Sequence, residues 1–169
     1  MKSKLTLLSF LCITSILFAQ KRTIPTDTTV VTTHTTTING KKINYTAYTG
    51  TQPVWDKEGA PKATLFYTYY KRTNNANTAN RPLLISFNGG PGSASVWMHV
   101  AYTGPRVLNV DDEGYPLQPY GVKTNPYSIL DVADIVFVNP VNTGYSRVLP
   151  DKDGKMPSRE KQKKMFFGV

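Results

Sequence analysis

The sequence predicts an α/β fold with a mixed sheet that begins with antiparallel strands. Two short apolar runs, 82–87 and 135–138, are bounded by turn residues and are typical of strands that are buried on both faces. Before them, a hairpin signal at Asn39-Gly40 and an aromatic run at 63–70 indicate antiparallel pairing. These observations together predict a β-rich first half, followed by buried-type strands with short helices between them.

The first segment, 1–20, has the composition of an export signal peptide. Lys2 and Lys4 precede an apolar stretch at 5–18, and Ala19 offers a small-residue cleavage site. The stretch is shorter than the roughly 20 residues that cross a bilayer, so we predict cleavage and no stable membrane anchor afterwards. An uncleaved anchor is the alternative. The predicted location of the mature chain is secreted or periplasmic.

Composition narrows the classes of function. The single cysteine, Cys12, lies inside the leader, so the mature chain has neither disulfides nor a thiolate nucleophile. Removing the leader lowers the net charge from +9 to +7, and the excess gathers at 147–164, where seven basic residues are mixed with three acidic ones. No docking element or row of stacking aromatics accompanies this mixture. We therefore interpret it as a solvated loop and helix face and predict no nucleic-acid partner.

Residues 21–37 are rich in threonine, and we interpret them as an extended tether or an edge strand. His34 has no carboxylate or cysteine nearby in the sequence, so we expect an exposed strand residue there. The rest of the chain, 38–169, is interpreted as one domain of ordinary size without internal repeats.

The first half of this domain is β-like. Asn39-Gly40 predicts a tight turn, and 43–48 alternates weakly between apolar and polar residues, as a strand does. The segment 50–53 begins with glycine and ends with proline, so we expect it to interrupt this strand. The aromatic run at 63–70 predicts the next strand.

Helices and turns are expected after the first buried-type run. Residues 93–102 predict a short helix that breaks before Gly104-Pro105, and a brief strand is predicted at 107–110. A charged turn is predicted at 111–114. The segment 115–126 contains three prolines and is expected to be a loop.

The last part of the chain combines a strand with a helix. The run 135–138 is followed by Pro140, which cannot continue a central ladder. Ser158 is expected to cap a helix at 159–167. The helix ends in the apolar residues 165–167 with nothing after them to pack on, which predicts an incomplete domain.

A glycine-rich loop, 88–92, follows the first buried-type run directly. Its glycines permit positive φ and leave no Cβ to block a ligand that approaches the backbone. Pro91 fixes the next turn, so the remaining N–H groups are able to converge on an anion. Preorganised donors of this kind form an oxyanion hole, which stabilises the charge that develops on a carbonyl oxygen.

Three other interpretations of the loop compete with this one. A phosphate-binding loop lacks support because no Gly-Lys-Ser/Thr follows, and a dinucleotide fingerprint lacks its third glycine at the required spacing. A plain tight turn stays open on composition alone. No cofactor and no metal is predicted.

Several motifs, in their order, resemble those of the serine carboxypeptidase family. They are Asn88-Gly89-Gly90-Pro91-Gly92-Ser93-Ala94-Ser95, Gly104-Pro105, Asn125-Pro126-Tyr127-Ser128, Ala133-Asp134 before the second buried-type strand, and Pro140-Val141-Asn142-Thr143-Gly144-Tyr145-Ser146. With the aromatic strand before them, the match covers residues 62–146. The resemblance implies the N-terminal portion of an α/β-hydrolase fold, and a serine-type enzyme that hydrolyses C-terminal peptide bonds.

The resemblance also implies a role for each matching position. The backbone N–H of Gly90 would be one oxyanion donor, while Asn88 and Gly89 would help bind the free carboxylate of the peptide's C-terminal residue. Two positions depart from the family pattern. Ser93 stands where the family usually has cysteine, and Tyr102 stands where many members place a carboxylate-binding glutamate. A tyrosine hydroxyl is able to donate to a carboxylate; alternatively, Tyr102 only packs.

The catalytic serine, aspartate and histidine that the resemblance implies are not recognisable in the sequence. An α/β-hydrolase carries its serine in a Gly-x-Ser-x-Gly elbow, followed by the aspartate and then the histidine. No such pentapeptide occurs, and 144–148 lacks the second glycine and has no histidine after it. His34 and His99 both come earlier, and His99 is expected to be a packing or polar surface residue. The resemblance places the elbow beyond Val169.

Two functions remain as hypotheses. The first is a fragment of a secreted serine carboxypeptidase that acts on peptide or protein C termini and is inactive alone, because the nucleophile, base and orienting acid are missing. The second is a non-catalytic secreted protein that binds peptide carboxylates through the same loop.

Overall fold

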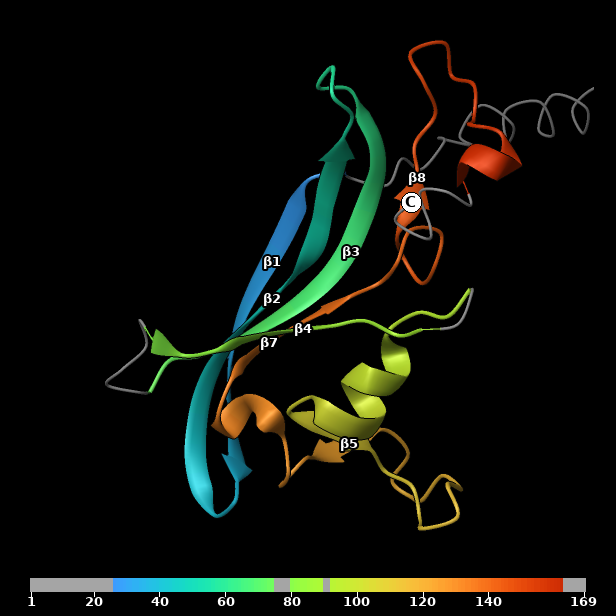
Figure 1. Cartoon of the computed structure of the whole chain (residues 1–169). Coiled ribbons are helices and arrows are strands. Elements are labelled where there is room, and N and C mark those ends of the chain that lie inside the picture. The colour runs from blue at the N-terminus through green and yellow to red at the C-terminus, as the bar shows by residue number, and fades with distance from the viewer. Residues whose placement is uncertain (1–25, 75–79, 90–91, 163–169) are drawn as a thin grey trace, which may run out of the picture.

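The computed structural model describes residues 26–74, 80–89 and 92–162, and Figure 1 shows them as a long twisted sheet with smaller elements beside it. The predicted leader 1–20, Gly90, and residues 163–167 of the predicted last helix lie outside the described residues. In chain order the strands are β1 (Thr28–Ile38), β2 (Lys41–Trp55), β3 (Pro61–Arg72), β4 (Leu83–Ser86), β5 (Arg106–Leu108), β6 (Val122–Thr124), β7 (Asp134–Val138) and β8 (Arg147–Val148). The short helical segments among these residues include η2 (Met98–Thr103) and η3 (Ile129–Asp131).

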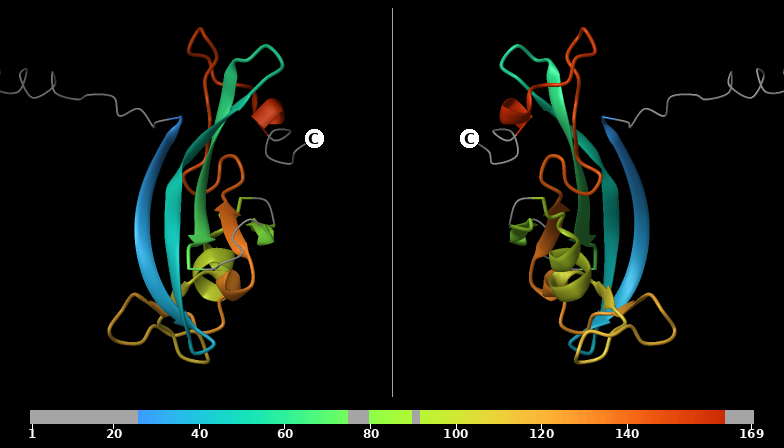
Figure 2. Two further views of the ribbon diagram at one scale, coloured as in Figure 1. Left: turned by 90° about the vertical axis from the view of Figure 1, so that its left-hand side faces the viewer. Right: turned by 90° about the vertical axis from the view of Figure 1, so that its right-hand side faces the viewer.

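The large sheet has the strand order β1-β2-β3-β7-β4. The short strand β8 also belongs to it and pairs with the beginning of β3, at Ala63 and Thr64. Its pairs are antiparallel except for β4 and β7, which run parallel. The predicted mixed sheet that begins with antiparallel strands is therefore confirmed. Figure 2 shows this sheet nearly edge-on, with the helical turns on one side of it.

The first hairpin forms where the sequence predicts it. Asn39 and Gly40 have φ values of 49° and 74°, as a two-residue turn with left-handed central residues requires. Every residue of β1 except His34 is β-branched, which favours an extended strand. Of the two interpretations of the threonine-rich segment, the structure contains the edge strand, from Thr28 onward.

The predicted interruption at 50–53 is wrong, because β2 continues unbroken through it. Gly50 pairs with Thr29, and a Cβ at Gly50 would collide with the carbonyl oxygen of Thr28. The glycine therefore permits a close approach of β1 to β2 and does not end the strand. Pro53 lies beyond Thr51, the last β2 residue that pairs with β1.

The two buried-type runs differ in their surroundings. β7 lies between β3 and β4, and its Ile135 and Phe137 are buried in the main core. β4 is correctly placed, but the prediction that it is buried on both faces is wrong, since Ile85 is 60% exposed. The reason is its position: β4 is the edge of the described sheet and has β7 as its single neighbour there.

A buried ion pair fixes the start of β4 against the start of β7. Arg81 Nε lies 2.9 Å from Asp134 Oδ1, and both side chains are more than nine-tenths buried. The same carboxylate oxygen accepts the backbone N–H of Arg72 at 3.1 Å. Because a buried charge is stable only when it is paired, this contact fixes the pairing of Leu83 with Asp134.

The segments after β4 depart in part from expectation. Helix begins at Val96 rather than at 93 and continues as the π-helical turn η2. The segment 115–126 is not entirely a loop, because Val122–Thr124 forms β6 and pairs with β5. The loop interpretation missed this short strand because its apolar signal is a single valine.

One type of loop occurs three times in the part of the chain that the structure describes. In each, an aspartate Oδ1 accepts the backbone N–H groups two and four residues later, at Asp56, Asp111 and Asp151. The glycine three residues after each aspartate has a φ of 77°, 90° or 75°. This Asp-x-x-Gly pattern satisfies the turn locally and confirms the charged turn predicted at 111–114.

The final described turn is helical at 159–162, and Lys161 N–H donates to Ser158 Oγ at 3.3 Å. The predicted cap is therefore confirmed.

Candidate active site

The candidate loop begins where β4 ends. Asn88 Nδ2 donates to Ser93 Oγ at 2.6 Å and to the carbonyl oxygen of Gly89 at 3.2 Å. The structure thus brings together three of the predicted site residues, Asn88, Gly89 and Ser93. The fourth loop residue, Gly90, lies outside the described residues, so its role as an oxyanion donor stays a prediction.

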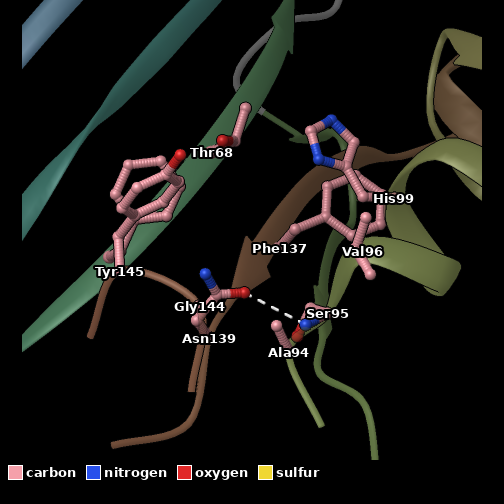
Figure 3. A pocket seen from close by; sticks show the side chains of 10 residues that line it. Thr68, Ala94, Ser95, Val96, His99, Phe137, Asn139, Gly144 and Tyr145 are labelled. Carbon is pink, nitrogen blue, oxygen red and sulfur yellow. Dashed lines mark hydrogen bonds between the residues drawn. The ribbon is translucent and has the colours of Figure 1, made fainter. Parts of the chain in front are cut away.

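Ser95 fastens this loop to the end of β7. Its hydroxyl accepts the backbone N–H of Asn88 at 3.1 Å and donates to the carbonyl oxygen of Val138. Its own N–H donates to Asn139 Oδ1 at 3.0 Å, the dashed contact in Figure 3. Ser95 is 2% exposed. The loop is therefore held by polar groups from the neighbouring strand, as a preorganised site requires.

The sequence analysis placed Ser95 within a motif but did not predict that Ser95 holds the loop. It did not identify Asn139 as a site residue. The signal that could have found them is their position. Asn139 directly follows the second apolar strand, Ser95 lies in the loop segment after the first, and neighbouring parallel strands end at the same edge of a sheet.

The segment after Asn139 is packed tightly against the loop. Gly144 has a φ of 50°, and a Cβ there would collide with the Asn139 carboxamide. Ser146 is fully buried, donates to the carbonyl oxygen of Asn139 at 2.7 Å and accepts the N–H of Phe66 at 2.8 Å. These contacts make Ser146 a structural residue, consistent with its sequence context, which is not that of an elbow serine.

A cavity of about 210 Å³ lies between the loop and the sheet. Its apolar wall is formed by Phe66, Phe137 and Val96, and its polar side by Ser95 and Asn139. Figure 3 shows Val96, Ser95 and Asn139 around it, with His99 over the ring of Phe137.

His99 is held in this wall as a neutral side chain. Its ring stacks on Phe137 with centroids 4.6 Å apart, and its Nε2 lies 2.6 Å from the Tyr70 hydroxyl. Burial lowers the pKa of His99 to about 4 and raises the pKa of Tyr70. Of the two expectations for His99, a packing residue or a polar surface residue, the structure shows the packing residue. His34 contacts the Thr32 hydroxyl on the exposed edge strand.

Tyr102 lies on η2 and is 63% exposed. No hydrogen bond links its hydroxyl to the Asn88 loop among the described residues, so the structure does not join this predicted site residue to the other three. The Tyr102 side chain is not buried, so its hydroxyl is accessible to a ligand.

Within residues 26–74, 80–89 and 92–162, no group of three His, Cys, Asp or Glu side chains is placed to hold a metal ion. In the same part of the chain, no helix has the length and apolar character needed to cross a bilayer.

Comparison with known proteins identifies the family. The family model for serine carboxypeptidases matches residues 38–167. The pheromone-processing carboxypeptidase KEX1 of Saccharomyces cerevisiae is 32% identical over 104 residues, which are 60% of this chain and 13% of that protein. Carboxypeptidase Y of the same yeast is 35% identical over 104 residues, which are 61% of this chain and 17% of the relative.

A solved structure also matches. The crystal structure of the prohormone-processing carboxypeptidase Kex1(delta)p from Saccharomyces cerevisiae aligns with a TM-score of 0.49 at 21% identity. The alignment covers 73% of this chain and 27% of that chain. The chain thus spans less than a fifth of the length of these two curated relatives.

Proposed function

This chain belongs to the serine carboxypeptidase family, with the N-terminal mixed sheet of an α/β-hydrolase, and on that premise we propose that its 88–95 loop binds peptide C termini. In the whole enzyme, the loop would serve the hydrolysis of C-terminal peptide bonds through an acyl-enzyme. The names of the yeast relatives refer to pheromone and prohormone processing, which supports a peptide or protein C terminus as the substrate.

The contact between Asn88 and Ser93 carries this proposal. Ser93 Oγ accepts a hydrogen bond from Asn88 Nδ2 at 2.6 Å, which leaves the Ser93 hydroxyl hydrogen available to a ligand. The Asn88 amide meets the Gly89 carbonyl only at 3.2 Å, so a carboxylate could replace this partner. A charged acceptor forms stronger hydrogen bonds than a neutral one, which favours that exchange. Ser93 in place of the usual cysteine thus adds a donor to the site.

Gly90 would then donate its backbone N–H to the carbonyl oxygen of the scissile bond. Oxyanion donors act in pairs or sets, and removing one typically costs about 3–4 kcal/mol of transition-state stabilisation. The chain contains no Gly-x-Ser-x-Gly pentapeptide that would supply the nucleophile. We therefore expect these 169 residues to bind a peptide carboxylate without cleaving the peptide.

The test uses an N-blocked dipeptide, the same dipeptide as its C-terminal amide, and a serine-directed phosphonate. We expect the acid to bind more tightly than the amide, Asn88→Ala to remove the difference, and neither turnover nor labelling to occur. Equal binding of acid and amide would refute the carboxylate site, while stoichiometric labelling would refute the absence of a nucleophile.

A non-catalytic secreted protein that binds peptide carboxylates is the second candidate. It rests on the Asn88–Ser93 contact, which could bind a carboxylate without a nucleophile. Reading the coding DNA beyond Val169 separates the two: a continuing frame with Gly-x-Ser-x-Gly supports the enzyme, and a stop codon with stable expression supports the binding protein. In both cases the basic and apolar start of the chain supports export.

A further inference from the structure

The cavity of about 210 Å³ beside Ala94 and Ser95 contains polar groups that the Asn88 loop does not use. Its lining residues come from three parts of the fold: β3, η2 with the turn before it, and β7 with the segment after it. Two of them, Val96 and Tyr145, are 51% and 67% exposed, so the cavity is open to solvent. A small ligand is therefore able to enter it.

The carboxamide of Asn139 is fixed with its nitrogen unused. Its Oδ1 accepts the N–H of Ser95 at 3.0 Å, and this donor distinguishes the oxygen of the side chain from the nitrogen. Within residues 26–74, 80–89 and 92–162, Nδ2 has no hydrogen-bond acceptor. Figure 3 shows this nitrogen turned away from Ser95. Asn139 therefore provides a donor to the cavity that it lines.

His99 provides a second donor. Its Nε2 lies 2.6 Å from the Tyr70 hydroxyl, while its Nδ1 has no partner in the described part of the chain. The part-buried Tyr70 hydroxyl finds no acceptor among the described residues other than this Nε2. Since buried hydroxyl groups are rarely left without an acceptor, Tyr70 donates to Nε2, and the proton of the neutral imidazole is on Nδ1. The ring is held in place by its stacking on Phe137, with centroids 4.6 Å apart.

The charge of the cavity favours an uncharged ligand. No Lys, Arg, Asp or Glu among the described residues lines it. Burial alone lowers the pKa of His99 to about 4, without a contribution from a neighbouring charge, so the imidazole is neutral at pH 7. An anion in this cavity would lose its hydration and gain no cationic partner, which is unfavourable. The cavity thus differs in chemistry from the carboxylate site proposed at Asn88.

The apolar wall indicates the size and shape of the ligand. Phe66, Phe137 and Val96 form this wall. In another protein, an apolar cavity of about 150 Å³ is large enough to bind benzene. A volume of about 210 Å³ therefore has room for one ring and a small polar group.

We propose that this cavity is a second binding site, which takes small uncharged molecules that carry an aromatic ring next to a carbonyl group. The ring packs against Phe66, Phe137 and Val96. The carbonyl oxygen accepts hydrogen bonds from the unused N–H groups of Asn139 and His99. Benzamide is a simple molecule with this chemistry, and its binding does not depend on the carboxylate site at Asn88.

The test titrates benzamide and benzoate, which have the same shape and differ in charge, into the 169-residue chain at pH 7 and follows the binding by NMR. We expect benzamide to bind about tenfold more tightly than benzoate and to shift the signals of the Asn139 carboxamide and His99 Nδ1–H. Absence of benzamide binding, equal binding of the two probes, or shifts confined to other residues would overturn the proposal. A free chain whose histidine ¹⁵N spectrum places the His99 proton on Nε2 would overturn it as well.

Two variants test the donor and the wall. His99→Phe keeps a ring against Phe137 and removes the Nδ1 donor, so the affinity for benzamide should fall about fivefold. Val96→Trp places a larger side chain at the open side of the cavity, and we expect a fall of about tenfold or more. Val30→Trp is the matched control, because Val30 is 61% exposed on β1 and does not line the cavity; its affinity should equal that of the wild type.

Unchanged affinity in both His99→Phe and Val96→Trp would overturn the proposal. If His99→Phe fails to fold, Val96→Trp and the wild-type preference for benzamide over benzoate still decide.

The carboxylate site and the cavity site fail separately, because their expected preferences are opposite. The Asn88 loop is expected to prefer a peptide acid to its amide, and the cavity is expected to prefer benzamide to benzoate. Loss of the first preference alone would refute the carboxylate site and leave the cavity site standing. Loss of the second alone would overturn the cavity site and leave the carboxylate site standing.

Discussion

Acidification should destabilise this chain through His99. In the folded state the pKa of His99 is lowered to about 4 by burial, from an ordinary value of 6.5. Between these two values the unfolded chain binds a proton at this position and the folded chain does not, so stability falls as the pH falls. Each pH unit within that window removes about 1.4 kcal/mol, and the total loss at pH 4 is about 3 kcal/mol.

The structure explains why the proton is excluded. The ring of His99 stacks on Phe137, and the Tyr70 hydroxyl occupies its Nε2. The pKa of Tyr70 is itself raised by burial and by the neighbouring Tyr45, so this hydroxyl stays neutral and provides no counter-charge for an imidazolium. Protonation must therefore break the packing or place an unpaired charge in it.

The assay is urea unfolding followed by tryptophan fluorescence at several pH values between 7 and 4. His99→Gln removes the titrating ring and keeps a side chain able to hydrogen-bond Tyr70, so its stability should depend less on pH than that of the wild type. His34→Gln, at the chain's other histidine, is the matched control and should behave like the wild type. Identical pH dependence in the wild type and His99→Gln would refute the reasoning.

Three further variants test the supports of the loop by chemical denaturation. Arg81→Met leaves the buried Asp134 without its ion-pair partner, and we expect the free energy of unfolding to fall by about 3–5 kcal/mol; an unchanged midpoint would show that the carboxylate finds water instead. Gly144→Ala should lower the free energy of unfolding more than Gly154→Ala. Both glycines have positive φ, but a Cβ at Gly144 would collide with Asn139, whereas a Cβ at Gly154 meets open space; equal losses of stability would contradict this reasoning. Ser95→Ala should lower the free energy of unfolding by about 1–3 kcal/mol, because two part-buried backbone groups lose their partner, and it should weaken binding of the dipeptide acid.

Local patterns predicted much of the fold. Asn39-Gly40 specified its hairpin because a two-residue turn with positive φ accepts few other residues. The β-branched and aromatic run in β7 is buried because it lies inside the sheet. Gly50, in contrast, was interpreted as a break, because its reason for being glycine is the nearby Thr28 carbonyl. No local pattern contains that information.

For the candidate site, too, the sequence predicted the local loop but not the residues that hold it. The sequence identified Asn88, Gly89 and Ser93 as members of one loop, and they lie together. The groups that hold the loop come from Asn139, 44 residues away from Ser95, so spacing along the chain could not reveal them. Only the parallel pairing of β4 with β7 brings the two ends together.

The ion pair at the start of β4 also affects the position of the loop at the other end of the strand. Its four residues span about 13 Å and lie between the Arg81–Asp134 contact and the Asn88 loop. A slip of β4 by one residue along β7 would carry Asn88 about 3.3 Å and turn alternate side chains to the other face of the sheet. The ion pair therefore sets the register of β4 along β7, and this register determines where the Asn88 loop lies.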